Sequence, residues 1–320
     1  MRIHLPNSAF LGNIDPFLRE FDTSEPDKLE ITANKKWISV HPVVLSMVAA
    51  LGQTVKPSNI SCERLEATSK HYLERMGLFK FLGIKSAITI TEHESAGRFI
   101  PITQINDSSA LTRFITEMTP LLHLEPRHAE PIRYIVSELV RNVLEHASAK
   151  QGAVLSAQYF QKSNTIRIGI ADTGVGIKQT ISNAYPVKND LEAIQLALTP
   201  GVTGTTRREG GTEYNAGAGL FFIKSIANVN RDFFMIYSGR AMYKLLKRKP
   251  NSKIKLFADP FNDRHSKEEN LPFWQGTVVG IDISLDATRE FSALLDLIKD
   301  TYTKAVKERK KAKYKKARFI

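Results

Sequence analysis

Ser137-Glu-Leu-Val-Arg-Asn142-Val-Leu-Glu-His146 is the stretch of sequence around which the rest of the chain can be arranged. Apolar residues recur at steps of three and four from Ile132 to Ala147, which predicts a long helix with one apolar face. On the opposite face, Glu138 and Asn142 are stacked one turn apart. Taken alone, this polar pair indicates only a solvated helix surface, and the segments that follow change that interpretation.

Three later segments supply the glycines and the carboxylate that accompany this polar pair. A β-hairpin predicted at 153–160 and 165–171 leads directly into the first segment, and a glycine-rich loop at 201–218 ends in the second. The three segments are the turn Asp172-Thr-Gly174-Val-Gly176-Ile177, the loop end Gly217-Ala-Gly219-Leu220, where a helix begins, and the strand start Gly276-Thr277. Their residue types are those that a nucleotide site requires.

The first two segments predict contacts to a base and to phosphates. Adenine carries an exocyclic amine that donates hydrogen bonds, so a buried carboxylate at a strand end, here Asp172, is a suitable acceptor. Gly174 and Gly176 let the backbone pass close to the base and sugar because they carry no side chains. Backbone N–H groups at a glycine-rich loop and helix start, from Gly217 to Gly219, suit a triphosphate.

The central helix supplies the groups for a metal ion and for catalysis. Mg²⁺ needs few protein ligands when phosphate oxygens and waters complete its shell, so the amide oxygen of Asn142 is the candidate metal ligand. Glu138, one turn earlier, is the candidate general base that orients or deprotonates an attacking water or hydroxyl. We therefore expect the chain to bind ATP and Mg²⁺.

Together these segments resemble the GHKL superfamily, which includes gyrase B subunits, heat-shock chaperone ATPases, histidine kinases and mismatch-repair ATPases. Glu138-x-x-x-Asn142 resembles its N box, Asp172 to Gly176 its first glycine box, Gly217 to Leu220 its second, and Gly276-Thr277 the pair that closes the adenine pocket. The resemblance implies an ATP lid at 201–216. It also implies nucleotide contacts for Asn142, Asp172, Gly174, Gly176, Ile177, Gly217, Gly219, Leu220 and Thr277.

Within that superfamily, the sequence around Glu138 looks closest to anti-sigma-factor serine kinases. Sensor histidine kinases usually carry Asn at this position, and the 43 residues after Thr277 are too few for the transducer domain of gyrase-type ATPases. Three functions stay open. They are an ATPase or ATP-dependent switch in which Glu138 activates water, a serine/threonine protein kinase acting on a separate regulator, and a non-catalytic nucleotide-sensing module.

Residues 1–83 predict a smaller α/β unit that resembles a STAS domain. The resemblance is carried by two short β-prone runs, an apolar helix at 43–51 and the run Tyr72-Leu-Glu-Arg-Met-Gly-Leu-Phe79. The turn before the helix reads Val40-His41-Pro42, so it lacks the phosphorylatable serine that bacterial STAS regulators often carry there. We interpret His41 as a helix-start residue.

The expected fold is therefore α/β, with a two-layer sandwich of the GHKL (Bergerat) type preceded by a smaller STAS-like domain. The expected parts are 1–83 STAS-like, 84–124 connecting strands and helix, 125–286 ATP-binding, and 287–320 C-terminal helix and basic tail. Short strands are also predicted at 54–56 and near 254–257. Lys224, just beyond the second glycine motif, is predicted either to contact phosphate or to lie on the surface.

Composition and charge limit the setting and the partners. The chain has 42% hydrophobic residues but no apolar run long enough for a membrane span, and its single cysteine, Cys62, suits a reducing cytoplasm. Residues 304–320 carry +8 of the net charge of +12. This tail is either a solvated helix end or a segment that binds nucleic acid through phosphate contacts. The resemblance further implies a protein partner, and it is compatible with a homodimer.

Overall fold

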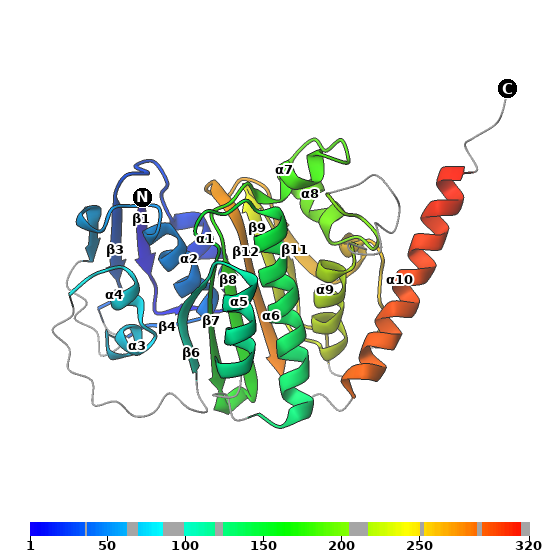
Figure 1. The fold of residues 1–320 in the computed structure, drawn as a ribbon, viewed down its shortest axis with the longest axis horizontal. Coiled ribbons are helices and arrows are strands. Elements are labelled where there is room, and N and C mark those ends of the chain that lie inside the picture. The colour runs from blue at the N-terminus through cyan, green and yellow to red at the C-terminus, as the bar shows by residue number, and fades with distance from the viewer. Residues whose placement is uncertain are drawn as a thin grey trace.

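The computed structural model shows a mixed α/β protein in which one large antiparallel sheet lies between two layers (Figure 1). This arrangement confirms the expected α/β class. The structure describes residues 1–35, 37–62, 70–85, 99–118, 124–204, 217–249, 253–286 and 290–314.

Seven strands form the large sheet in the order β11-β10-β9-β12-β8-β7-β6, and every neighbouring pair is antiparallel. The strands are β6 (Phe99–Ile105), β7 (Ala153–Phe160), β8 (Thr165–Ala171), β9 (Phe234–Gly239), β10 (Ala241–Leu245), β11 (His265–Glu268) and β12 (Trp274–Ser284). The hairpin of β7 and β8 has the predicted bounds. Asn164 closes it in a left-handed conformation (φ 42°), which Asn adopts more readily than most residues.

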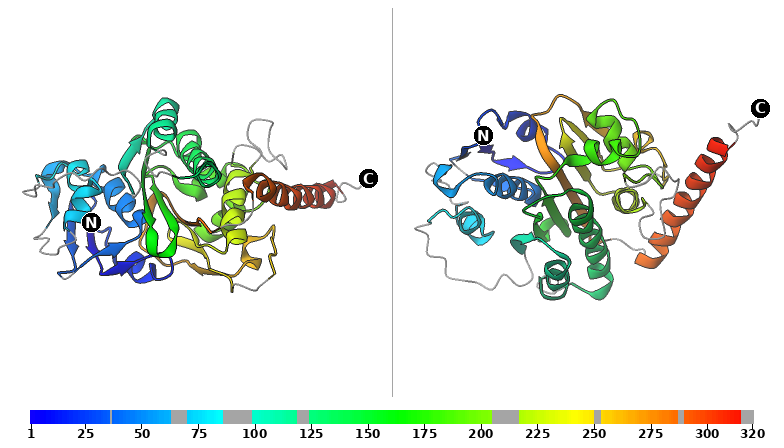
Figure 2. Two further views of the ribbon diagram at one scale, coloured as in Figure 1. Left: turned by 90° about the horizontal axis from the view of Figure 1, so that it is seen from below. Right: turned by 45° about the horizontal axis from the view of Figure 1, so that its top comes forward.

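A layer of helices covers one face of this sheet (Figures 1 and 2). The helices are α5 (Ser108–Arg113), α6 (Pro126–His146), α7 (Gly176–Ser182), α8 (Asp190–Ala197), α9 (Gly219–Asn230) and α10 (Phe291–Tyr314). The predicted apolar face of α6 is confirmed, because Ile135, Leu139 and Val143 are buried in the core with the sheet. Arg141 and Glu145 on the same helix are exposed.

The N-terminal residues form a smaller unit on the other face of the sheet (Figure 1). A parallel sheet of β1 (Arg2–Leu5), β3 (Leu29–Ala33) and β5 (Ile60–Cys62) lies at its outer side, with a second parallel pair, β2 (Ser8–Ala9) and β4 (Ser39–Val40). The helices of the unit are α1 (Asp15–Glu20), α2 (Pro42–Gly52), α3 (Lys70–Arg75) and α4 (Leu78–Phe81), with a 3-10 turn at Pro57–Asn59.

Helix α2 joins the two units because it is buried along its whole length. Its apolar sequence has no polar side, which is typical of a helix that is covered all round. Gly169 in β8 leaves room for it, since a Cβ there would lie 2.2 Å from both the backbone N and the Cα of Val43. Ser46 donates a hydrogen bond to the Gly169 carbonyl (2.9 Å) and contacts the Ser156 hydroxyl (3.0 Å), so its polar group is satisfied inside this interface.

His41 caps α2 and ties it to the last strand of the large sheet. Its Nδ1 accepts from the N–H of Val43 (3.0 Å), so its Nε2 carries the proton that is donated to Asp282 Oδ1 (3.2 Å). Burial lowers the pKa of His41, against the opposing effect of Asp282, which keeps the ring in this neutral form. The prediction that His41 is a helix-start residue is confirmed.

Two of the predicted short strands are wrong. Residues 54–56 lie in the turn that follows α2, and the next strand of the chain is Ile60–Cys62, which pairs with β3 on the side away from β1. Residues 254–257 form no strand, because Ile254 and Leu256 pack half-buried against the helical core rather than pairing in the sheet. The edge of the sheet is formed by β11, whose polar sequence His-Ser-Lys-Glu gives little strand signal.

The segment between the two predicted domains belongs structurally to the large sheet. β6 pairs with β7 at the sheet edge, and α5 packs beside α6. Among the described residues, no helix combines the length and the apolar character that crossing a membrane requires.

We expect Gly169→Ala to destabilise the protein, because its methyl group would collide with the backbone of α2 rather than with a movable side chain. The matched control is Gly12→Ala, whose methyl group would meet only the Phe233 ring, at 3.3 Å. Urea denaturation should show a loss of at least about 2 kcal/mol for Gly169→Ala and clearly less for the control. Equal stabilities of the two variants would contradict the described docking of α2.

Candidate functional site

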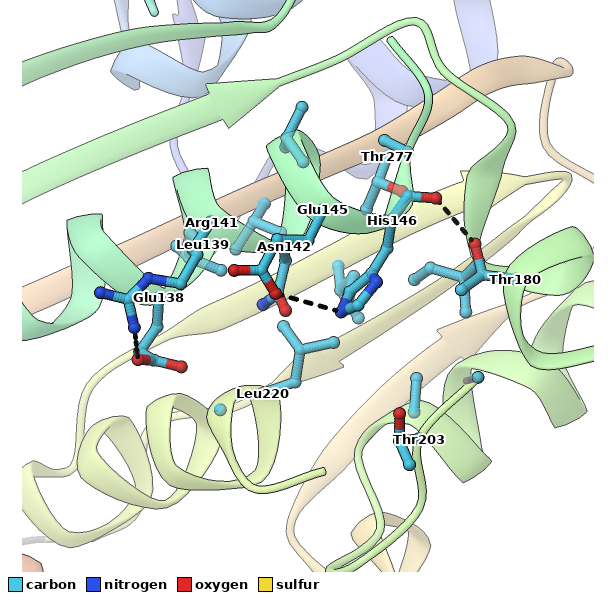
Figure 3. A pocket seen from close by; sticks show the side chains of 18 of the residues that line it. Glu138, Leu139, Arg141, Asn142, Glu145, His146, Thr180, Thr203, Leu220 and Thr277 are labelled. Atoms are coloured by element: carbon cyan, nitrogen blue, oxygen red, sulfur yellow. Dashed lines mark hydrogen bonds and ion pairs between the residues drawn. The ribbon is translucent and has the colours of Figure 1, made fainter. Parts of the chain in front are cut away.

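The predicted site residues converge on one cavity of about 680 Å³ on the helical side of the sheet (Figure 3). The cavity lies between α6, the start of α7, the start of α9 and the strands β8, β9 and β12. Nine of the ten predicted residues line it, namely Glu138, Asn142, Asp172, Gly176, Ile177, Gly217, Gly219, Leu220 and Thr277. The tenth, Gly174, lies behind the lining, where a Cβ would be 2.1 Å from the carbonyl oxygen of Ala147.

Asp172 lies at the inner end of the cavity, directly after β8, and only 2% of the residue is exposed. Its Oδ1 accepts from the N–H of Gly174 (2.8 Å), and its carbonyl oxygen accepts from the indole N–H of Trp274 (3.0 Å). The backbone N–H of Asp172 donates to the Thr277 carbonyl (2.9 Å). Side chain and main chain are therefore both held in place from several directions.

Burial makes this carboxyl group a much weaker acid than a solvent-exposed aspartic acid. The loss of solvation raises the pKa of Asp172 to about 7, although the N–H groups of Gly174 and Thr277 act in the opposite direction. A carboxyl with a pKa near neutrality can change its protonation when a ligand arrives. Gly276 allows the strand to run this close, because its φ is +103° and a Cβ would lie 2.7 Å from Asp172 Oδ1.

The turn after Asp172 is fixed by a serine that none of the sequence motifs indicated. Ser238 on β9 accepts from the N–H of Ile177 (3.0 Å) and donates to the Gly276 carbonyl (2.6 Å). Gly176 occupies the left-handed region (φ +79°) between these partners, which favours glycine. The first glycine motif and Gly276-Thr277 are thus linked through one hydroxyl group.

The second glycine motif places the start of α9 beside α6. The N–H of Gly201 donates to the Gly217 carbonyl (3.1 Å), which joins the two ends of the glycine-rich loop. A Cβ at Gly219 would lie 2.7 Å from Glu138 Oε2, so any larger residue there would displace the Glu138 carboxylate from its position. The first turn of α9, whose N–H groups have no acceptor within the helix, consequently lies next to Glu138 and Asn142. The lid residues 205–216 lie outside the described residues.

Glu138 and Asn142 line the cavity from α6 (Figure 3). The Glu138 side chain is 26% exposed, and its Oε1 lies 3.5 Å from Nη1 of Arg141. Partial burial raises the pKa of Glu138, with Glu145 acting in the same direction and Arg141 against it. The Nδ2 atom of Asn142 is buried and has no hydrogen-bond partner among the described residues.

The unpartnered amide of Asn142 fits a site whose remaining contacts come from a ligand. An amide has an oxygen and a nitrogen end that can exchange places, so Asn142 can turn its oxygen toward a cation. The described residues contain no group of three or more His, Cys, Asp or Glu side chains placed to hold a metal ion. Mg²⁺ coordinated mainly by phosphate and water needs no such group, so the donor set is compatible with it.

Several lining residues were not predicted as site residues. They include Tyr134, Arg141, His146, Thr180 and Thr203 (Figure 3). Tyr134 and Arg141 could have been found, because they lie one turn either side of Glu138 on the same helix. The hydroxyl of Thr180 donates to the Gly176 carbonyl (3.1 Å), and only the fold shows that this residue lines the cavity.

Lys224 takes neither of its two predicted roles. Its ammonium group is fully buried and forms an ion pair with Asp263 Oδ2 (2.5 Å), while the Phe257 carbonyl accepts from it at 3.2 Å. Asn228 completes the arrangement by donating to Asp263 Oδ1 (2.5 Å). Lys224 does not line the cavity. It instead anchors α9 to the chain that follows β10.

Comparison with protein-family models finds no match to this chain, and comparison with curated proteins finds none either.

We expect Asp172→Asn to stabilise the ligand-free protein in a pH-dependent way. The pKa of this carboxyl is about 7 in the folded protein and about 3.9 in the unfolded chain. The unfolded chain therefore ionises first, and the free energy of unfolding falls as the pH rises between these two values. The amide cannot ionise, so the melting temperature of the variant should exceed that of the wild type more at pH 8 than at pH 5. Equal differences at both pH values would show that Asp172 does not titrate in this range.

Proposed function

We propose that this protein binds Mg-ATP in the described cavity and hydrolyses it slowly, with Glu138 as the general base, as a regulatory switch of the GHKL class. The observation that carries the proposal is the convergence of four separate sequence segments on one cavity, whose lining includes a buried carboxyl and a carboxylate–amide pair. A cavity of about 680 Å³ is within the size range of small-molecule sites.

In this proposal Asp172 reads the adenine base. Its ionised carboxylate accepts from the exocyclic amine, and its burial excludes water that would compete for the same hydrogen bond. Because the pKa of Asp172 is about 7 without ligand, the amine favours the ionised form and base binding releases a proton at neutral pH. The backbone turn at Gly176 and the Thr277 side of β12 border the same end of the cavity.

The phosphates lie toward the start of α9 in this proposal. The N–H groups of the first turn of α9 are not used within the helix, and the helix dipole adds to their attraction for anions. Gly217 and Gly219 bring this helix start to the wall of the cavity that Asn142 and Glu138 form. Asn142 would hold Mg²⁺ through its amide oxygen, and the bound ion would neutralise phosphate charge.

Glu138 acts as the base in this arrangement. Its raised pKa brings it closer to the value at which a carboxylate both stays ionised and accepts a proton from water. Arg141 lies on the same edge and limits that rise by its positive charge. The reaction needs the ionised form, so the rate should increase as the pH rises through the pKa of Glu138.

The architecture supports the same class. An antiparallel sheet with helices on one face agrees with the two-layer sandwich that the resemblance implies, and the N-terminal parallel strands with their helices agree with the smaller STAS-like unit. The placement of that unit against the back of the large sheet supports a role for it as a fixed part of the ATP-binding protein.

The first test uses Asp172→Asn and isothermal titration calorimetry with Mg-ATP. Because the amide presents N–H groups where the amine also donates, affinity should fall about tenfold or more. Wild-type binding at pH 7 should release protons, measured from the dependence of the heat on the buffer, and the variant should not show this release. Unchanged affinity in the variant would rule out the assignment of the base to this end of the cavity.

The second test compares Glu138→Gln with Glu145→Gln, which lies on the same helix and lines the same cavity. Glu138→Gln should keep ATP affinity within about threefold and lower phosphate release by about 100-fold or more, whereas Glu145→Gln should hydrolyse ATP normally. Wild-type turnover in Glu138→Gln would eliminate the proposed base.

The same assay separates the remaining functions. Transfer of the labelled γ-phosphate to a protein rather than to water would identify a kinase. Tight ATP binding by the wild type without any phosphate release would identify a nucleotide sensor.

A further inference from the structure

Helix α10 has two halves of different character. Its first half is apolar on one side, where Phe291, Leu294 and Ile298 are buried in the helical core. Tyr302 continues that contact, with its ring 5.9 Å from the ring of Phe222 on α9. The second half begins at Lys304, from which the sequence carries nine Lys or Arg residues and a single acidic residue to its last position.

Three lysines of the second half form an exposed stripe. Lys304, Lys307 and Lys311 are exposed, and their spacing of three and four residues places them on one side of the helix. At 1.5 Å per residue the stripe is about 10 Å long. None of the three forms an ion pair with a described residue. Their charges are therefore available to a partner.

The lysines of the stripe lie on the exposed side of α10, and the helix is still covered by the body of the protein at Ala305 and Val306. Arg309, between the lysines, donates to the Pro200 carbonyl (3.0 Å), which fixes the helix against the body at that level. Beyond this point the last described turns of α10 stand clear of the other helices and strands in each view (Figures 1 and 2). The exposed side of α10 that carries the three lysines is therefore accessible to a partner.

We propose that this stripe, which we call the α10 lysine stripe, binds the phosphate backbone of nucleic acid. A linear array of positive charge matches the regular array of phosphates, and such contacts require no particular base sequence. A membrane surface fits less well, because a helix that lies in a lipid interface needs a broad apolar face opposite its basic one. Between Lys307 and Tyr314 the apolar side chains are limited to Ala312 and Tyr314.

The experiment compares two variants with the same net charge. In the first, Lys304, Lys307 and Lys311 are changed to Gln. In the control, Lys56, Lys80 and Lys85 are changed to Gln; these are exposed lysines of the N-terminal unit, which lies at the opposite end of the molecule from α10 (Figure 1). The three stripe lysines are helical and Gln keeps a good helix former there, while the control lysines are exposed, so both variants should fold.

Binding is measured by fluorescence anisotropy with a 30-base-pair DNA duplex and a 30-nucleotide single-stranded RNA, between 50 and 200 mM KCl and without nucleotide. The wild type should bind with strong salt dependence, and the stripe variant should lose about 2.7 from the slope of log affinity against log salt on the duplex. The control should bind as the wild type does.

Three results would overturn the proposal. The first is no binding of either nucleic acid by the wild type at 50 mM KCl, and the second is equal weakening by the two variants. The third is binding to phosphatidylglycerol vesicles but not to nucleic acid. A preference for duplex or for single strand would identify which phosphate backbone is used. The ATP cavity takes no part in this assay, so its outcome is independent of the proposed nucleotide function.

Discussion

The large sheet has two buried faces, and the chemistry of the cavity follows from that constraint. On β8, Ile168 and Ile170 belong to the helical core, whereas Gly169 and Ala171 face α2. A strand buried on both faces carries the next residue of the chain, Asp172, into a position that bulk water cannot reach from behind. The raised pKa of this carboxyl is thus a property of the two-sided packing as much as of the cavity itself.

The two carboxyl groups of the site differ in burial, and that difference separates their proposed roles. Asp172 is almost fully enclosed and titrates near neutrality, which suits a group that binds a ligand and adjusts its protonation to it. Glu138 keeps part of its surface exposed and has a guanidinium group beside it, so it retains access to water. Gly219 lets the start of α9 lie against Glu138, because a Cβ at this position would come within 2.7 Å of Glu138 Oε2.

Much of the helical layer and its strands could be predicted from local patterns. The hairpin β7–β8, helix α6 and helix α9 have strong alternation or helical spacing, and motif order alone predicted that Asn142 and Asp172 would line one site. The N-terminal docking was not predicted, because it depends on the shapes of two distant surfaces. Two features of the sequence did indicate this docking. Gly169 is a glycine inside a strand, and helix α2 has no polar side. The Lys224–Asp263 pair joins residues 39 positions apart, and no short-range pattern indicates it.

The hydrogen bond from Arg309 to the Pro200 carbonyl joins the basic helix to the base of the glycine-rich loop, whose ends meet at Gly201 and Gly217. This contact connects the helix that carries the proposed polyanion site with the loop beside the proposed ATP cavity. Thermodynamic linkage makes any coupling between them reciprocal. If a polyanion bound to α10 changes the affinity for ATP by some factor, ATP changes the affinity for the polyanion by the same factor. The chain would in that case report its nucleotide state to a nucleic acid and sense the nucleic acid at its nucleotide site, through the contacts that join α10 to the glycine-rich loop and to α9.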